Sequence, residues 1–172
     1  MVPFIEYCQT VSRRSMAISL DTAAFVWFMC VTRRAGSACD LGSGFTSYVL
    51  RRTRAEVTSV DDSEEWLERT GQFLARYGKS TGELLMWDEW QERTDTYDVV
   101  VHDFASGDLR ESSMWVAADA VAPGGVLIFD DAQHAGHLAE MLRVAEAHDW
   151  VLYDIRGVTE DPVRRFAAMA AA

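Results

Sequence analysis

The sequence lacks long hydrophobic runs, an excess of positive charge and the cysteine spacing of a metal site or a disulfide framework. Its longest apolar run, residues 23–31, is too short to span a bilayer. The chain has 16 basic and 27 acidic residues, and the resulting net charge of −11 would repel a phosphate backbone. The three cysteines, Cys8, Cys30 and Cys39, are odd in number and lie among apolar neighbours, which is typical of a reduced protein. The sequence therefore predicts a cytoplasmic protein whose partners are neither nucleic acids nor membranes.

One segment near the start favours export instead. Residues 12–19, SRRSMAIS, resemble a twin-arginine signal, and the apolar run and the small residues 35–38 follow it. However, Asp21 interrupts the apolar region, and cleavage after Ala38 would cut into the first predicted strand. We therefore favour the cytoplasm over export.

The length of 172 residues is typical of one domain. Residues 1–37 are expected to form a helical cap, because Phe25, Phe28 and Met29 keep helical spacing. Residues 38–172 are expected to form the core, in which strands and helices alternate. Helical segments are predicted through residues 48–50 and at residues 63–79, 108–122 and 135–148. Seven strands are predicted: one that ends at Asp40, and others at residues 56–62, 83–87, 97–104, 126–132, 150–156 and 165–172.

This alternation implies right-handed crossovers between parallel strands. We expect an α/β fold of the Rossmann-like, doubly wound type, with a mostly parallel seven-stranded sheet and helices on both faces. Ligands of such sheets bind at the carboxyl ends of the strands, beside the point where strand order reverses. Acidic residues occur where most of the predicted strands end, so the fold would gather them along one edge. They are Asp40, Asp61, Asp88, Asp103, Asp130 and Asp131.

The sequence DLGSG at residues 40–44 combines a strand end with a glycine turn. Gly42 and Gly44 allow a tight turn and a close approach to a ligand, although a plain turn would use glycines too. Asp61 lies about 20 residues further on, where a carboxylate can bind both hydroxyls of a ribose. A dinucleotide site favours a third glycine where Ser47 stands, and Asp40 would repel a pyrophosphate but suit an amino group and a sulfonium. The charge therefore favours S-adenosylmethionine over NAD.

On these residues the chain resembles the class I S-adenosylmethionine-dependent methyltransferases, from about residue 38 to the C-terminus. The motifs are DLGSG, SVDD at residues 59–62, YDVVVHD at residues 97–103 and PGGVLIFDD at residues 123–131. The resemblance implies that Asp40 lies near the methionine part of the cofactor, that Asp61 binds ribose and that Asp88 lies near adenine. Thr46 stands where many members of the family carry a third glycine. The resemblance also places four further residues against the cofactor: Gly42, Ser43, Gly44 and Asp103.

Within that family the chain is most similar to small-molecule O-methyltransferases of the catechol type. Those enzymes hold a divalent ion between an acid after strand four and a pair of residues after strand five, which correspond here to Asp103, Asp130 and Asp131. Independently of the resemblance, clustered carboxylates repel one another by energies on the order of kcal/mol per close pair unless a cation lies between them. Oxygen ligands suit Mg²⁺, which would orient a substrate hydroxyl and lower its pKa. The alternative is that Asp130 or Asp131 caps the next helix or faces solvent.

Methyl transfer requires an acceptor about 3 Å from the methyl group and a base that takes its proton. His134 is the first candidate for that base, with Asp103 as the second catalytic residue, and His102 and His137 are weaker candidates. The alternative for His134 is an ordinary place in the first turn of a helix. Ser106 stands where catechol-type enzymes carry a lysine, which argues against a catechol acceptor.

The sequence thus predicts a methyltransferase that acts on a small molecule, at oxygen. Trp66 or Trp87 could flank an adenine, and Ser15 and Met16 could close over the cofactor. Two other functions stay open: a non-catalytic partner subunit that binds S-adenosylmethionine, and a NAD-dependent oxidoreductase. Because no inserted segment forms a lid, the N-terminal helices or a second subunit must cover the site, and on that ground we expect a homodimer.

Overall fold

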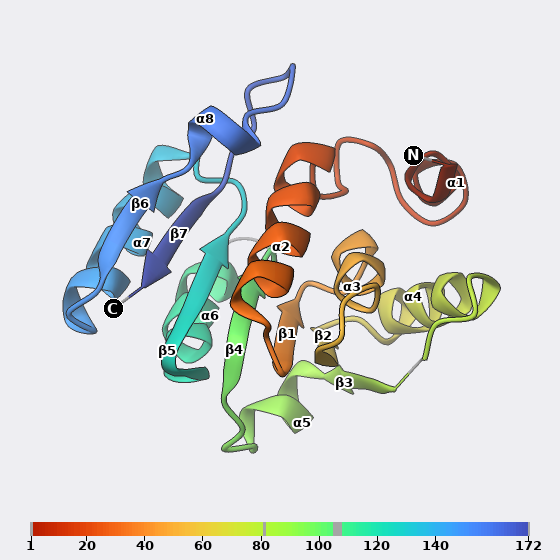
Figure 1. Cartoon of the computed structure of the whole chain (residues 1–172), viewed down its shortest axis with the longest axis horizontal. Coiled ribbons are helices and arrows are strands. Elements are labelled where there is room, and N and C mark those ends of the chain that lie inside the picture. The colour runs from red at the N-terminus through yellow and green to blue at the C-terminus, as the bar shows by residue number, and fades with distance from the viewer. Residues whose placement is uncertain (1, 81, 105–107, 172) are drawn as a thin grey trace.

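A computed structural model describes residues 2–80, 82–104 and 108–171 and shows a seven-stranded sheet flanked by helices (Figure 1). The strand order is β3-β2-β1-β4-β5-β7-β6. The first five strands in this order pair in parallel, and β7 is antiparallel to both of its neighbours. This architecture confirms the expected doubly wound α/β fold. The strands are β1 (Ser37–Leu41), β2 (Glu56–Asp61), β3 (Glu83–Met86), β4 (Tyr97–His102), β5 (Val121–Phe129), β6 (Val151–Asp154) and β7 (Ala168–Ala171).

Helices cover both faces of the sheet, with α2 in front of it and α6 and α7 behind it in the view of Figure 1. The long apolar strands form because each must fill a core on both sides. Along β4, for example, Val99 and Val101 lie in one buried cluster and Val100 lies in the other, as the alternation of side chains along a strand requires. The helices are α1 (Val2–Thr10), α2 (Leu20–Arg33), α3 (Phe45–Leu50), α4 (Glu64–Arg76), α5 (Trp87–Gln91), α6 (Asp108–Asp119), α7 (Ala135–Ala147) and α8 (Arg156–Thr159).

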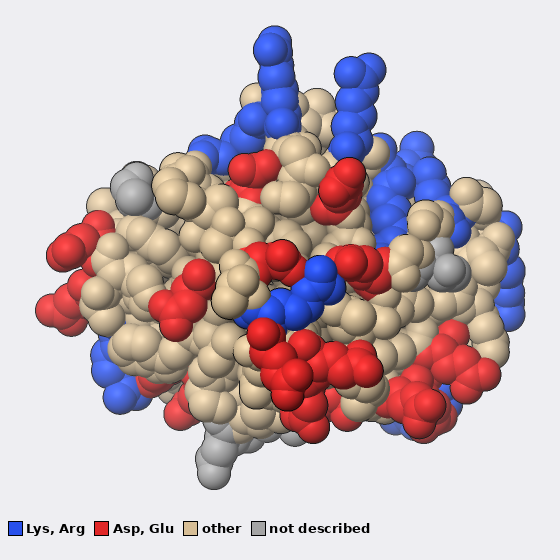
Figure 2. Space-filling view, turned by 90° about the horizontal axis from the view of Figure 1, so that it is seen from below, with Lys and Arg blue, Asp and Glu red and all other residues tan. Residues whose placement is uncertain are grey.

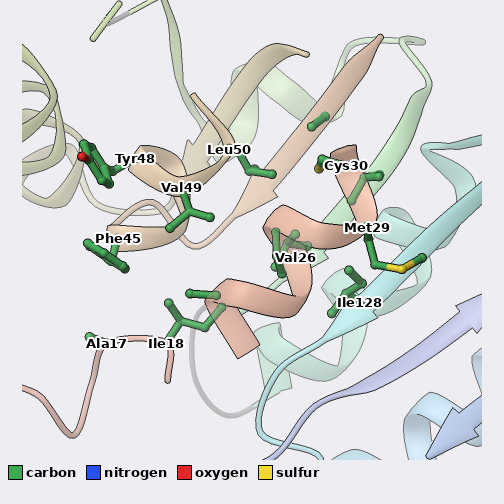
Figure 3. Packing of buried hydrophobic residues seen from close by; sticks show 14 of the residues in the cluster. Ala17, Ile18, Val26, Met29, Cys30, Phe45, Tyr48, Val49, Leu50 and Ile128 are labelled. Carbon is green, nitrogen blue, oxygen red and sulfur yellow. The ribbon is translucent and has the colours of Figure 1, made fainter. Parts of the chain in front are cut away.

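The two N-terminal helices pack directly onto the core. Ser19 caps α2, because its side chain accepts a hydrogen bond from the backbone N–H of Thr22 at 3.0 Å. Figure 3 shows Val26, Met29 and Cys30 of α2 in the same cluster as Ile128 of β5. The N-terminal segment therefore contributes to the same hydrophobic cluster as the sheet. The division into a cap and a core stays a prediction.

The order of strands reverses between β1 and β4, which places a crevice at their carboxyl ends. The two ends lie in contact, since the backbone N–H of Asp103 donates to the carbonyl of Leu41 at 2.8 Å. A side chain on Gly42 would block this approach, because its Cβ would lie 2.0 Å from the carbonyl oxygen of Asp103 and because its φ is +101°. Asp61 ends β2, and Asp130 directly follows β5, so three of the predicted acids do meet at this edge.

Several boundaries differ from the sequence-based prediction. The helix expected to reach residue 122 ends at Asp119, and β5 already begins at Val121, before the PGG sequence. This early start pairs Tyr97 with Val121 through a shift of register between Tyr97 and Val99, and local sequence does not reveal such an irregularity. Trp87 begins α5 instead of ending β3, and the short helix α8 was not predicted. None of the helices in the described residues is long and apolar enough to cross a membrane.

The net charge is unevenly distributed over the surface. Figure 2 shows the face that lies at the bottom of Figure 1, with basic side chains along its upper and right-hand edges and acidic side chains across its middle and lower parts, where basic side chains also lie among them. Exposed arginines that follow α2 and α3 include Arg34, Arg52 and Arg54. The excess of negative charge therefore does not make this face uniformly acidic.

Candidate functional site

A cavity of about 430 Å³ lies at the carboxyl ends of β1, β2 and β4. Its size suits a small ligand. The glycine turn after β1 forms one wall, α1 and residues 12–18 form another, and the ends of β2 and β4 close the floor. The charged residues that line it are Asp61, Asp62, Asp103, Asp131 and Arg110. Four acids against one arginine give the cavity a negative potential, which favours a positively charged ligand.

Asp61 lines the cavity and also holds the glycine turn. Its Oδ2 accepts hydrogen bonds from the backbone N–H and the hydroxyl of Ser43, both at 2.9 Å. Its Oδ1 accepts from the backbone N–H of Ser63 at 3.1 Å. Burial raises the pKa of Asp61 to about 6, and these hydrogen bonds oppose the rise. The carboxylate is thus fixed in place at the cavity wall, where the resemblance expects a contact with ribose.

Asp40 lies beneath the glycine turn and is completely buried. Its Oδ2 accepts a hydrogen bond from the hydroxyl of Ser47 at 2.5 Å, and Ser47 in turn accepts from the backbone N–H of Gly44 at 3.0 Å. The residue that replaces the third glycine of a dinucleotide motif therefore ties the turn to Asp40. The other carboxylate oxygen, Oδ1, is buried without a partner among the described residues. Burial raises the pKa of Asp40 to about 7, so a nearby cation would stabilise its charged form.

Tyr7 of α1 is a cavity residue that the sequence did not reveal. Its ring packs against Phe45 and Phe73 with centroids 5.6 and 5.1 Å apart. Its hydroxyl lies only 2.6 Å from the place that a Cβ on Gly44 would take. Burial and the neighbouring carboxylates of Asp40 and Asp103 raise the pKa of this hydroxyl. No motif marks α1, and the only signal is the helical spacing of Phe4 and Tyr7.

Arg110 of α6 is the second residue that sequence reasoning missed. Its Nη2 lies 3.3 Å from Oδ1 of Asp103 and 3.3 Å from Oδ2 of Asp131. The same nitrogen lies 3.5 Å from the carbonyl oxygen of Asp130. Only 7 % of the Arg110 side chain is exposed, against 19 % for Asp103 and 26 % for Asp131. A guanidinium therefore lies among the three acids that the sequence assigned to a metal ion.

The three acids do not fit a divalent ion in this arrangement. A divalent ion placed about 4 Å from a guanidinium would be repelled by about 8 kcal/mol at an effective dielectric constant of 20. The two carboxylate oxygens nearest to Arg110, on Asp103 and Asp131, already pair with it. Asp130 is buried, with Oδ1 lacking a hydrogen-bond partner in the described part of the chain. Among the described residues, no group of three or more histidines, cysteines or acids is arranged to hold a metal.

The histidines differ in their surroundings. His134 is exposed at the N-cap of α7, and its ring lies 5.2 Å from that of the half-buried His137. His102 is completely buried, bonds to the hydroxyl of Ser113 at 2.7 Å and has its pKa lowered to about 3 by burial. None of these three rings lines the cavity as described. Ser106 lies outside the described residues.

The adenine contacts expected from the sequence fall in different places. Trp66 is half-buried and lines the cavity. Trp87 instead packs inside the core against Phe104, with ring centroids 4.7 Å apart. Asp88 is exposed in the first turn of α5 and is not among the described residues that line the cavity. Ser15 and Met16 line the same cavity as the glycine turn.

Three solved structures illustrate what this fold resembles. An O-methyltransferase from Bacillus cereus in complex with SAH is 14 % identical, with 99 % of this chain and 90 % of that chain covered and a TM-score of 0.79. The O-methyltransferase TomG from Streptomyces achromogenes, involved in tomaymycin synthesis and in complex with SAM, is 16 % identical, with coverages of 92 % and 82 % and a TM-score of 0.71. A precorrin-6y C5,15-methyltransferase from Geobacter metallireducens is 13 % identical, with coverages of 95 % and 95 % and a TM-score of 0.73.

Neither a protein-family model nor a curated protein matches the sequence. The structural likeness spans nearly the whole chain, so the protein has the Rossmann-like fold of the S-adenosylmethionine-dependent methyltransferases. The predicted resemblance is confirmed at the level of this fold.

Proposed function

We propose that the protein is a methyltransferase that transfers the methyl group of S-adenosylmethionine to an oxygen of a small-molecule acceptor. The observation that carries this proposal is the acidic cavity at the switch point of the sheet, bounded by the glycine turn, Asp61 and Asp103. The neighbouring structures with SAM or SAH bound support the same cofactor. A volume of about 430 Å³ and the net charge of −11 favour a small acceptor over a nucleic acid.

The residues of the cavity fit the charge of this cofactor. S-adenosylmethionine supplies an electrophilic methyl group on a positively charged sulfonium. Asp103 lines the cavity, and Asp40 lies beneath the turn with one oxygen that has no partner among the described residues. Both supply negative charge near the turn. Asp61 and Trp66 both line the cavity. Asp61 would accept hydrogen bonds from ribose, and Trp66 would lie against adenine. Asp88 near adenine stays a prediction from the sequence alone.

The chain has two tasks in the transfer itself. It holds the acceptor oxygen in line with the carbon–sulfur bond, whose electron pair passes to sulfur as the new carbon–oxygen bond forms. It also removes the proton of the acceptor. Asp103 lines the cavity, and burial raises its pKa to about 7, which suits a base at neutral pH. His134, the first candidate from the sequence, stays a prediction, and it is not among the described residues that line the cavity.

A homodimer stays a prediction. Residues 12–18 and Tyr7 of the same chain already form one wall of the cavity, so this chain supplies part of the cover itself. The apolar side chains of Trp27, Phe28 and Val31 on α2 remain exposed and would suit an interface. The cytoplasmic location likewise rests on the sequence.

The experiment that tests the function measures thermal unfolding with S-adenosylhomocysteine and, separately, with NADH. A ligand at 100 times its Kd adds about 2.7 kcal/mol of stability. We expect S-adenosylhomocysteine to raise the melting temperature and NADH to leave it unchanged. Asp61→Ala should abolish that shift, whereas Asp149→Asn, at an exposed turn, should retain it.

The two alternative functions predict different results in these experiments. A shift with NADH alone would favour the oxidoreductase. Binding of S-adenosylhomocysteine without methylated product, across a panel of hydroxylated small molecules analysed by mass spectrometry, would favour the non-catalytic subunit. The acidic lining speaks against NAD, because a pyrophosphate would lie beside four carboxylates.

A further inference from the structure

We propose that the guanidinium of Arg110 takes the place of a divalent metal ion at the carboxyl ends of β4 and β5, so that methyl transfer in this protein needs no metal. The metal-free transfer rests on the proposed function, but the placement of Arg110 does not. Arg110 would act as a positioning residue that holds Asp103 and Asp131 at the cavity wall.

The guanidinium of Arg110 lies between the carboxyl ends of β4 and β5. One nitrogen, Nη2, lies 3.3 Å from a carboxylate oxygen of Asp103, which follows β4, and 3.3 Å from one of Asp131, which follows β5. It also lies 3.5 Å from the carbonyl oxygen of Asp130. A single charged nitrogen thus bridges the two strand ends that a bound metal ion would bridge.

The surroundings of Arg110 keep the side chain there. It is 93 % buried, because only 7 % of its surface is exposed. Asp131 is held from its other side, since its Oδ1 accepts a hydrogen bond from Nε2 of Gln133 at 2.7 Å. Asp131 also has a φ of +59°, a conformation that aspartate and asparagine adopt more readily than most residues. The carboxylate is therefore oriented toward Arg110 by its own backbone and by a neighbour.

The positive charge of Arg110 is permanent. A guanidinium does not lose its proton in proteins, so it cannot become neutral to admit a second cation. A metal ion could enter only if the Arg110 side chain left its buried place, and both carboxylates would then exchange one positive partner for another. The sequence does not indicate that Arg110 lies between these acids, because Arg110 is seven positions after Asp103 and outside every motif.

The replacement has a consequence for the acceptor. A metal ion can orient a substrate by binding two of its oxygens at once. A guanidinium that already pairs with two carboxylates has fewer donors left for the acceptor. The acceptor therefore needs no second hydroxyl beside the one that is methylated.

The test is a titration with Mn²⁺ followed by isothermal calorimetry and by the electron paramagnetic resonance of the free ion. We expect no binding to the wild-type protein and one Mn²⁺ per chain bound by Arg110→Ala, in which Asp103 and Asp131 lose their positive partner. Arg110→Lys is the matched control, because it keeps the charge and should still exclude Mn²⁺. Asp131→Asn in the Arg110→Ala background should remove the new site.

Two results would overturn the proposal. One is stoichiometric binding of Mn²⁺ by the wild-type protein that Asp131→Asn abolishes, and the other is a folded Arg110→Ala protein that binds no Mn²⁺. If Arg110→Ala does not fold, Arg110→Met, which retains most of the buried volume, takes its place, and the wild-type titration remains decisive. The titration needs no methyl donor, so a protein that fails to bind S-adenosylhomocysteine would refute the proposed function and leave this test intact.

Discussion

Gly42 and Gly44, in the turn after β1, are restricted to glycine by different contacts. Gly42 has a φ of +101°, and a Cβ there would lie 2.0 Å from a backbone oxygen. Gly44 has a φ of 169°, which is extended backbone that any residue adopts. Among the described residues, a Cβ there would come close to the hydroxyl of Tyr7. The constraint on Gly42 is therefore set by the backbone, whereas the constraint on Gly44 is set by one side chain.

This difference predicts which substitution can be rescued. Gly42→Ala should destabilise the protein by about 2 kcal/mol or more, because backbone would have to move. Gly44→Ala should cost less, and Tyr7→Phe should restore most of the loss, since removal of the hydroxyl leaves the nearest ring carbon 3.6 Å away. Urea unfolding of the single and double variants measures this coupling. A Gly42→Ala protein that Tyr7→Phe rescues equally well would contradict the assignment.

At the scale of elements, α1 is a helix of the N-terminal segment that reaches the cavity, beside residues 12–18. Its buried residues Phe4 and Tyr7 pack on Phe45 of α3, with the rings of Phe4 and Phe45 5.0 Å apart. Tyr7 reaches the cavity, whereas Ile5 is 48 % exposed on the same helix. The helix thus joins the aromatic core to the glycine turn.

Deletion of residues 2–10 should therefore weaken binding of S-adenosylhomocysteine by about tenfold or more, equivalent to about 1.4 kcal/mol. The sheet should persist, because its strands pair without help from α1. Calorimetry gives the affinity and circular dichroism checks the fold. Ile5→Ser is the control and should change neither. Unchanged affinity in the shortened protein would show that α1 is not a wall of the site.

At the scale of the whole molecule, buried acids link stability to pH. Burial raises the pKa of Asp40 and Asp103 to about 7 and that of Asp61 to about 6. The folded state therefore holds protons that the unfolded state releases, and this contribution is complete below the unfolded pKa near 4 and is lost as the pH rises through 6 to 7. His102 acts in the opposite sense, because its lowered pKa costs stability as the pH falls below about 6.5. The three acids outweigh the one histidine.

The protein without cofactor should thus be more stable at about pH 6 than at about pH 8. Asp40→Asn removes one of the buried charges and should stabilise the protein above pH 7, by at most about 4 kcal/mol, while weakening the binding of the donor. Melting temperatures across this range check the prediction, with Asp149→Asn as the exposed control. A gain in Asp40→Asn that is equal at all pH values would rule out ionisation as its cause.

The sequence by itself determined the fold and the glycine turn. The apolar segments and the DLGSG motif depend on residues that are close together in the chain, so they can be recognised without the tertiary structure. Accordingly, β1, β2, β4 and α4 lie within a few residues of their predicted bounds. The gathering of Asp61, Asp103 and Asp131 at one cavity also followed, because strand ends in a parallel sheet must meet.

Only the tertiary structure decided what lies between those acids. Arg110 and Tyr7 come from helices without motifs, and their roles depend on the packing of α6 and α1 against strand ends that are distant in sequence. The start of β5 at Val121 likewise depends on its pairing with Tyr97. Side-chain direction across such distances is fixed by the completed core, which no local pattern encodes.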